Sequence, residues 1–248
     1  MKNDINENKA LSQTSVMCWA VDNLELLKSQ PNESVDLIYS DILYGTGRNF
    51  GDYQDLKPIR SEIESHYLPR LIEMKRVLKQ NGSIYLQMDC KISHWIRCLM
   101  DDVFGYDNFI NEIIWKYGLG GSGKKAFAKK HDNIFLYSKS KDYVFNLLYE
   151  DATSNKMKGM KKKMIDVWDI PNINNMAKER VDYKTQKPKE LIKRFVLASS
   201  NENDVVADYY LGSGTTAEVC KDLNRNFIGC DINPNAIELT KTRLNAGT

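Results

Sequence analysis

The chain has 248 residues, which is enough for one sizeable α/β domain with a small insertion and too few for two full domains. Hydrophobic residues make up 42% and charged residues 27% of it, which is typical of a globular protein. No apolar run approaches the roughly 18 residues of a membrane helix, and the polar first residues lack the apolar segment of a signal peptide. We therefore expect a cytoplasmic protein without a membrane partner.

In chain order, seven apolar segments bounded by polar or glycine-containing turns are predicted strands: residues 16–21, 35–40, 83–88, 112–117, 133–137, 205–210 and 227–230. Helical spacing of apolar residues predicts a helix over 61–79 that Asn81-Gly82 ends. Two more helices are predicted after Pro188 and after Asn233-Pro234, with Asn233 as the N-cap. This alternation predicts a mainly parallel sheet with helices on both faces.

Charge is unevenly distributed along the chain. Residues 116–163 contain 12 lysines and four acidic residues, so this segment carries +8 while the whole chain carries only +2. Such asymmetry indicates either a surface that faces a polyanion or a solvated lysine-rich loop. Residues 150–163 have no usable apolar period and are predicted to form a mobile loop. The five cysteines are scattered without a C-x-x-C pair, so no metal site is expected.

A glycine-containing loop follows the predicted strand at 205–210. Gly212 and Gly214 lie between that strand and a helix, where glycine lets the backbone approach a ligand at the carboxyl end of a strand. A structural turn is the alternative interpretation. The next strand ends in Asp231, a position where an acidic side chain can accept hydrogen bonds from a ribose. The two features together favour a nucleoside cofactor.

A second segment, residues 35–44, reads as a buried strand whose carboxyl end carries Asp41 and Tyr44. Taken alone, the aspartate could cap a turn and the tyrosine could pack on the core. The two segments together resemble the DNA adenine and cytosine amino-methyltransferases, whose signature is D/S/N-P-P-Y/F and whose cofactor loop is F-x-G-x-G. Residues 41–44 (Asp-Ile-Leu-Tyr) are similar to the signature, and residues 210–214 (Tyr-Leu-Gly-Ser-Gly) to the loop.

The likeness extends from Ser15 to Leu244 and includes the segments 21–23, 111–115 and 185–188. The signature precedes the cofactor loop, as in the permuted β group of the family. The resemblance implies a Rossmann-like S-adenosylmethionine-dependent methyltransferase fold with a mainly parallel seven-stranded sheet. It further implies a single methyltransferase domain over 1–248 with an inserted target-recognition region at 118–184. The basic segment lies there, together with Tyr117, Phe127 and the loop Gly118–Gly123, so its lysines are expected to contact DNA phosphates.

By the same resemblance the cofactor is S-adenosylmethionine. The residues that it assigns to the cofactor are Gly212, Ser213, Gly214 and Thr215 at the methionine part, Asp231 at the ribose, Asp22 at the adenine ring, and Asp208 and Lys187 at the amino acid end. We expect His94, His131 and Asp89 to make structural hydrogen bonds instead.

The resemblance assigns catalysis to Asp41, Ile42 and Tyr44. The Asp41 carboxylate and the Ile42 carbonyl would accept hydrogen bonds from an exocyclic amine, and the carboxylate would stabilise the charge that nitrogen acquires. Tyr44 would stack on a base flipped out of the duplex. In the family, aspartate at the first signature position usually accompanies N6 of adenine, so adenine is the expected target.

The chain departs from the family at Ile42-Leu43, where two prolines are usual, and at Tyr209, where one is. We expect a less rigid loop that retains activity, because the carbonyl at position 42 is kept. Methylation of cytosine N4, methylation of RNA, and a non-catalytic DNA-binding role are the alternatives. The partners that the resemblance implies are double-stranded DNA, a second copy of the chain, and a cognate restriction endonuclease.

Overall fold

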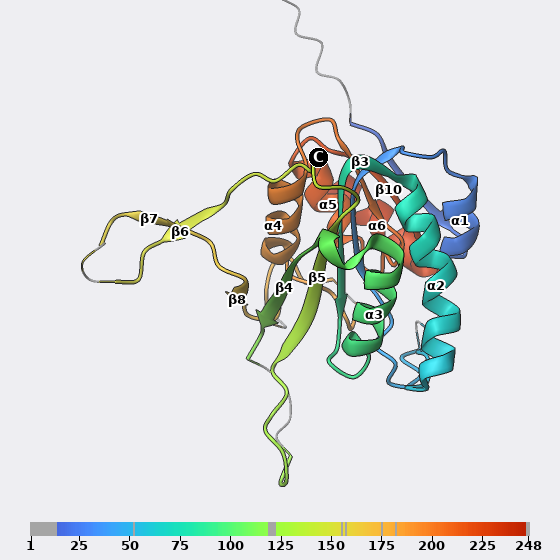
Figure 1. Ribbon diagram of the computed structural model, residues 1–248, viewed down its shortest axis with the longest axis horizontal. Helices are drawn as coiled ribbons and strands as arrows, with labels where there is room; N and C mark the ends of the chain where they lie inside the picture. The colour runs from blue at the N-terminus through green and yellow to red at the C-terminus, as the bar shows by residue number, and fades with distance from the viewer. Residues whose placement is uncertain are drawn as a thin grey trace, which may run out of the picture.

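The computed structural model describes residues 14–51, 53–118, 123–154, 156, 158–174, 176–181 and 183–246. An eight-stranded sheet forms the centre, in the order β1-β10-β9-β2-β3-β5-β4-β8 (Figure 1). Its strands are β1 Val16–Ala20, β2 Val35–Asp41, β3 Leu78–Met88, β4 Phe109–Lys116, β5 His131–Ser138, β8 Val167–Asp169, β9 Val205–Asp208 and β10 Asn226–Asp231. Only β5 runs antiparallel to its neighbours, so the prediction of a mainly parallel α/β sheet is confirmed.

Helices cover both faces of this sheet. One apolar core packs it against α1 Asn23–Ser29, α2 Arg60–Val77 and α3 Ser93–Phe104. A second core packs it against α4 Lys189–Ser199, α5 Thr215–Asp222 and α6 Pro234–Ala246. Strand β2 contributes to both, because Ile38 faces the first core while Leu37 and Tyr39 face the second. A strand buried on both faces needs a nearly continuous apolar run, which is what residues 35–40 have.

Three details differ from the sequence predictions. The sheet has an eighth strand, β8, which pairs with β4 at the edge and is too short to stand out as an apolar run. Helix α2 ends at Val77, and Asn81-Gly82 lie inside β3, where the pairing with β2 is irregular between Val35 and Leu37. Residues 150–163 are not simply a loop, because Tyr149–Asp151 (β6) and Lys161–Lys163 (β7) form an antiparallel ladder.

The orientation of the strands determines where a site can form. Strands β1, β10, β9, β2, β3, β4 and β8 all end at one edge of the sheet, and the antiparallel β5 begins there. The described part of the segment between β4 and β5 projects from this edge, and the β6–β7 hairpin projects to one side (Figure 1). Residues 119–122 of the predicted loop Gly118–Gly123 lie outside the described residues. Within the described ranges, no helix is both long and apolar enough to span a bilayer.

Candidate active site

A cavity of about 580 Å³ lies at the carboxyl edge, which is within the usual range for a small-molecule site. Its wall is built from the segments that follow β1, β2, β9 and β10, and six of the eight residues predicted to bind a cofactor line it: Asp22, Lys187, Gly212, Ser213, Thr215 and Asp231. Asp41, Ile42 and Tyr44 line it as well. The topology therefore brings together most of the residues that the sequence singled out.

The glycine loop joins β9 to α5. Gly214 has a φ of +74° and is the N-cap residue of α5, and a Cβ at this position would clash with the Thr240 side chain. Gly212 has a φ of +52°, and a Cβ there would lie 3.3 Å from the Tyr183 ring. Both positions favour glycine because side chains rarely adopt positive φ, and at Gly214 a side chain would also collide with Thr240. The loop conformation leaves Ser213 and Thr215 lining the cavity.

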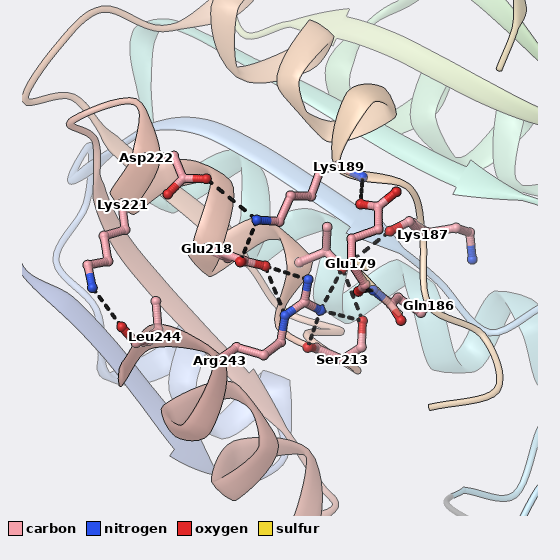
Figure 2. Close-up of polar contacts among 11 residues, drawn as sticks. Glu179, Gln186, Lys187, Lys189, Ser213, Glu218, Lys221, Asp222, Arg243 and Leu244 are labelled. Atoms are coloured by element: carbon pink, nitrogen blue, oxygen red, sulfur yellow. Dashed lines mark hydrogen bonds and ion pairs between the residues drawn. The ribbon is translucent and has the colours of Figure 1, made fainter. Parts of the chain in front are cut away.

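Arg243 of α6 supports this loop from behind. Figure 2 shows its guanidinium between the loop and Glu218 of α5. Nη1 donates to the Ser213 carbonyl at 2.8 Å and to Thr215 Oγ1 at 3.0 Å, and Nε donates to Glu218 Oε2 at 2.9 Å. Lys189 pairs with the other oxygen of Glu218. Arg243 is only 6% exposed, so its charge needs partners within the protein, and these contacts provide them.

Two acidic side chains lie at the carboxyl ends of the neighbouring strands β10 and β1. Asp231 ends β10, and its two oxygens accept the Gly212 and Asn233 N–H groups, each at 2.9 Å. Asp22 follows β1 and caps α1 by accepting the Leu24 N–H at 2.8 Å. Each carboxylate oxygen has a further lone pair, so Asp231 can accept ribose hydroxyls while it anchors the loop.

Asp22 has a partner that the sequence did not indicate. Arg70 of α2 lies 2.9 Å from its Oδ2 and donates through Nε to Asn23 Oδ1 at 2.6 Å. His66, one turn earlier, has its pKa lowered to about 4 by burial and by the Arg70 charge, so its ring is neutral at pH 7. Arg70, Asn23 and His66 all line the cavity. No local motif marks Arg70, because packing of α2 against α1 brings it to Asp22.

The signature segment forms the far wall. The Tyr44 hydroxyl lies 2.7 Å from Asp41 Oδ1 and 2.6 Å from Asp132 Oδ2. Lys187 forms an ion pair with Asp41 Oδ2, and its Nζ lies 5.5 Å from the centre of the Tyr44 ring. Lys187 therefore lies beside the predicted catalytic aspartate. Ile42 is 2% exposed, and its N–H donates to the Gln87 carbonyl at 3.1 Å.

A second cavity of about 430 Å³ adjoins the first and shares Tyr44, Thr185 and Lys187 with it. Trp115 and Tyr117 from the end of β4 contribute aromatic rings to it, packed edge to face at 5.1 Å. Asp132, from the start of β5, also lines it. Tyr44, which lines both cavities, contacts Asp41 of the first cavity through its hydroxyl. Trp115 lies in the segment 111–115 that the resemblance includes, whereas Asp132 was not singled out from the sequence, although the adjacent His131 was.

Two of the predicted cofactor residues do not line the cavity. Asp208 is 2% exposed and lies behind the glycine loop, where it accepts the Tyr210 N–H at 3.0 Å and the Thr216 hydroxyl at 2.6 Å. Burial raises the pKa of Asp208 to about 7, although both hydrogen bonds favour its charged form. Gly214 is likewise placed to shape the loop.

The remaining predicted residues have ordinary surroundings. Asp89 accepts the Lys91 N–H at 2.7 Å in a turn, and the His94 ring packs on Trp95 at 4.6 Å. His131 pairs with Lys116 in the β4–β5 ladder. Among the described residues, no group of three His, Cys, Asp or Glu side chains is arranged to hold a metal ion.

Comparison with known proteins places these features in a family. The profile of the DNA methylase family (N6/N4 methyltransferases) matches residues 35–242. The chain is 37% identical over 234 residues to the Type II methyltransferase M.HpaI of Haemophilus parainfluenzae, which covers 90% of this chain and 72% of the relative. It is 32% identical over 250 residues to the DNA adenine methyltransferase YhdJ of Escherichia coli (strain K12), which covers 92% and 82%.

Solved structures show the same fold at lower sequence identity. The PvuII DNA methyltransferase (cytosine-N4-specific) aligns with a TM-score of 0.71 at 17% identity, over 93% of this chain and 86% of its own. M1.HpyAVI in complex with SAM aligns with a TM-score of 0.64 at 19% identity, over 93% and 99%. The expected Rossmann-like methyltransferase fold is therefore confirmed.

Proposed function

Because the chain belongs to the N6/N4 DNA methylase family and uses S-adenosylmethionine as its cofactor, we propose that it methylates N6 of adenine in double-stranded DNA. The observation that carries the proposal is the position of Asp41, which lines the first cavity and contacts the hydroxyl of Tyr44, a residue that lines both cavities. Aspartate at this place and the 32% identity to a relative named as an adenine methyltransferase favour adenine over cytosine. Cytosine N4 is the second candidate, since the family includes both kinds of enzyme.

The first cavity suits the cofactor chemically. Asp231 has acceptors for the ribose hydroxyls, and Asp22 lies further along the same wall with its charge balanced by Arg70. The glycine loop exposes backbone to the amino acid part, while Asp208 and Arg243 hold that loop in shape. S-adenosylmethionine supplies a methyl group on a positively charged sulfur, and the Asp41 carboxylate at the far wall is of the opposite sign.

The second cavity suits the target base. Tyr44 can stack on one face of a flipped base, and stacking of this kind is worth about 1–3 kcal/mol, which offsets much of the few kcal/mol that flipping costs. The amine of that base would donate hydrogen bonds to Asp41 and to the Ile42 carbonyl. The amine is a poor nucleophile because its lone pair is delocalised into the ring. A fixed carboxylate acceptor both localises the pair and stabilises the positive charge that nitrogen acquires.

The DNA would lie across the carboxyl edge of the sheet. We name the described residues between β4 and β5 (117, 118 and 123–130) the basic finger; they include the fully exposed Phe127 and the lysines Lys124, Lys125, Lys129 and Lys130. The finger projects from the same edge that holds Asp41 (Figure 1). In the hairpin, Lys161 pairs with Asp151 and Lys162 with Glu150.

The predicted target-recognition region, 118–184, contains β5 and β8, which belong to the central sheet. We therefore assign recognition to the parts of 118–184 outside these strands, chiefly the finger and the β6–β7 hairpin. Likeness to Type II methyltransferases supports a cognate restriction endonuclease as a functional partner. Assembly into a homodimer stays a prediction.

The proposal is tested by labelled methyl transfer to mixed-sequence duplex DNA, followed by identification of the methylated nucleoside. N6-methyladenine is the expected product, and N4-methylcytosine would replace adenine with the second candidate. Asp41→Ala should lower turnover by about 10²–10³-fold with cofactor affinity nearly unchanged, because the carboxylate acts on the amine. Asp102→Ala, at an exposed position of α3, is the matched control. Equal rates for wild type and Asp41→Ala would place the transferring site elsewhere.

A further inference from the structure

The Tyr44 hydroxyl makes two short contacts to carboxyl groups, and each contact needs a hydrogen. Two ionised carboxylates and one phenol together have only one. Its oxygen lies 2.7 Å from Asp41 Oδ1 and 2.6 Å from Asp132 Oδ2, both normal lengths for an O–H···O bond. A phenol has a single hydrogen and can donate it to one carboxylate only. The other short contact needs a hydrogen that comes from a carboxyl group.

The surroundings of the two carboxyls show which of them holds that hydrogen. Asp41 is paired with the ammonium of Lys187 through Oδ2, which stabilises a negative charge there. Asp132 is 4% exposed, and its Oδ2 also accepts a hydrogen bond from the neutral Gln87 amide at 2.8 Å. Burial raises the pKa of Asp132, while the Lys187 charge and the hydrogen bonds from Tyr44 and Gln87 act in the opposite direction. Because Asp41 has the ammonium partner and Asp132 is the more deeply buried carboxyl, the hydrogen that the geometry requires is assigned to Asp132.

Every packed element contributes to this balance. The titratable or charged groups that face Asp132 or line the same cavity are Asp41 at the end of β2, Tyr44 after it, Tyr117 after β4, Lys187 before α4, and Arg180 and Lys184 from the segment preceding Lys187. Burial also raises the pKa of Tyr44 far above its usual value, so the phenol keeps its hydrogen. Of these cations, Lys187 is already engaged by Asp41.

We propose that Asp132 is a positioning residue that works as a protonated carboxylic acid: it donates to the Tyr44 oxygen, which in turn donates to Asp41. This inference rests on the proposed function, because methyl transfer at Asp41 is what gives the network a catalytic purpose. The Tyr44 ring is held at its hydroxyl by both neighbours, and the single negative charge of the network stays on Asp41, where the amine must be bound. Ionisation of Asp132 at higher pH leaves one hydrogen for two carboxylates, so the ring loses one of its two restraints.

Infrared spectroscopy of the protein alone tests the protonation state. Because the buried Asp208 carboxyl also has a raised pKa, of about 7, the comparison is made in a parent protein that carries Asp208→Asn. This parent at pH 7 should show the C=O stretch of a protonated carboxyl that shifts on ¹³C labelling of aspartate. Adding Asp132→Asn should remove the band, and adding Asp102→Asn, at an exposed aspartate, should leave it in place. No such band in the parent, or the same band after Asp132→Asn, overturns the proposal. This experiment needs neither DNA nor cofactor, so its outcome is independent of the proposed function.

The pH profile of methyl transfer tests the positioning role. Wild-type kcat should fall by about tenfold or more on the alkaline side, whereas Asp132→Asn should be active with a flat profile there. The asparagine amide can donate to Tyr44, and the Gln87 amide can turn over because its other partner, the Tyr39 hydroxyl at 2.8 Å, both donates and accepts. Asp132→Ala should lose at least tenfold in kcat with unchanged cofactor affinity. Identical profiles for wild type and Asp132→Asn contradict the role, and if the wild type methylates nothing, the proposed function fails while the infrared result still decides.

Discussion

Replacement of Asp231 gives the sharpest test of the cofactor site, because its two oxygens already hold two backbone groups. A ribose hydroxyl bound by this carboxylate makes a charge-assisted hydrogen bond worth about 1.5–3 kcal/mol. At about 1.4 kcal/mol for each factor of ten, Asp231→Ala should weaken S-adenosylmethionine binding by roughly 10–150-fold. The loss should lie toward the upper end, because the Gly212 and Asn233 N–H groups also lose their acceptor.

Asp231→Asn separates the loss of the charge-assisted hydrogen bond to the ribose from the loss of the acceptors for the backbone N–H groups. The amide keeps one acceptor oxygen but lacks the charge, so the expected weakening is about tenfold. Titration calorimetry with the cofactor measures both variants, and Asp102→Ala serves as the control for loss of a carboxylate outside the site. Thermal unfolding identifies any variant that fails to fold. Affinity within twofold of wild type for a folded Asp231→Ala protein would refute the ribose assignment.

Two further predictions concern stability and DNA binding. The pKa of Asp208 in the folded protein is about 7, above the ordinary 3.8, so the free energy of unfolding should decline as pH rises through this interval. Asp208→Asn should remove that decline. Measured by denaturant unfolding, the stability of Asp208→Asn relative to wild type should therefore increase by roughly 2–3 kcal/mol between pH 5 and 8. A pH-independent difference would show that the group is not titrating there. Glutamine at Lys124, Lys125 and Lys129 should reduce the salt slope of DNA binding by about 0.9 for each DNA phosphate that is no longer neutralised by a lysine. The same change at residues 161–163 should have a smaller effect because two of those lysines are ion-paired, and an equal or larger effect would place the phosphates at the hairpin.

The fold was readable from the sequence where burial leaves a local signal. All seven predicted strands are present, because a strand covered on both faces needs a run of apolar residues. The eighth strand and the β6–β7 hairpin left no such signal. Val167–Asp169 is only three residues at the edge of the sheet, and β7 consists of three lysines, so their pairing depends on tertiary context.

The same distinction applies to the site. Asp41, Tyr44 and the glycine loop form compact motifs, and they could be located without coordinates. Arg70, Asp132 and Arg243 could not, because each meets its functional partner across a long sequence separation: Arg70 is 48 residues from Asp22, and Asp132 is 88 residues from Tyr44. Motifs thus locate the atoms that meet ligands, whereas the groups that hold those atoms in place come from packing.

Ile42 and Leu43, which stand where the family has Pro-Pro, are held by hydrogen bonds to neighbouring segments, and these bonds limit the flexibility of the loop. The Ile42 N–H donates to the Gln87 carbonyl at 3.1 Å, and the Leu43 carbonyl accepts the Tyr67 hydroxyl at 2.9 Å. Each hydrogen bond contributes about 0.5–1.5 kcal/mol, which is comparable to the roughly 0.4–1 kcal/mol that a compatible proline provides through the unfolded chain. The loop is therefore tied down by its neighbours, and the looser loop expected from the sequence is not what the contacts indicate.

It follows that proline at position 42 should not be neutral in this chain. Ile42→Pro removes the N–H donor to Gln87 and leaves that buried strand carbonyl without it, so the expected loss of unfolding free energy is about 1 kcal/mol even if φ suits proline. Ile42→Val is the control, since it keeps the donor and the branched side chain. Denaturant unfolding and methyl-transfer rates measured on both variants provide the comparison. If Ile42→Pro is as stable as Ile42→Val and at least as active as wild type, the Gln87 bond does not support Asp41, and the rigidity of the loop must come from its buried side chains.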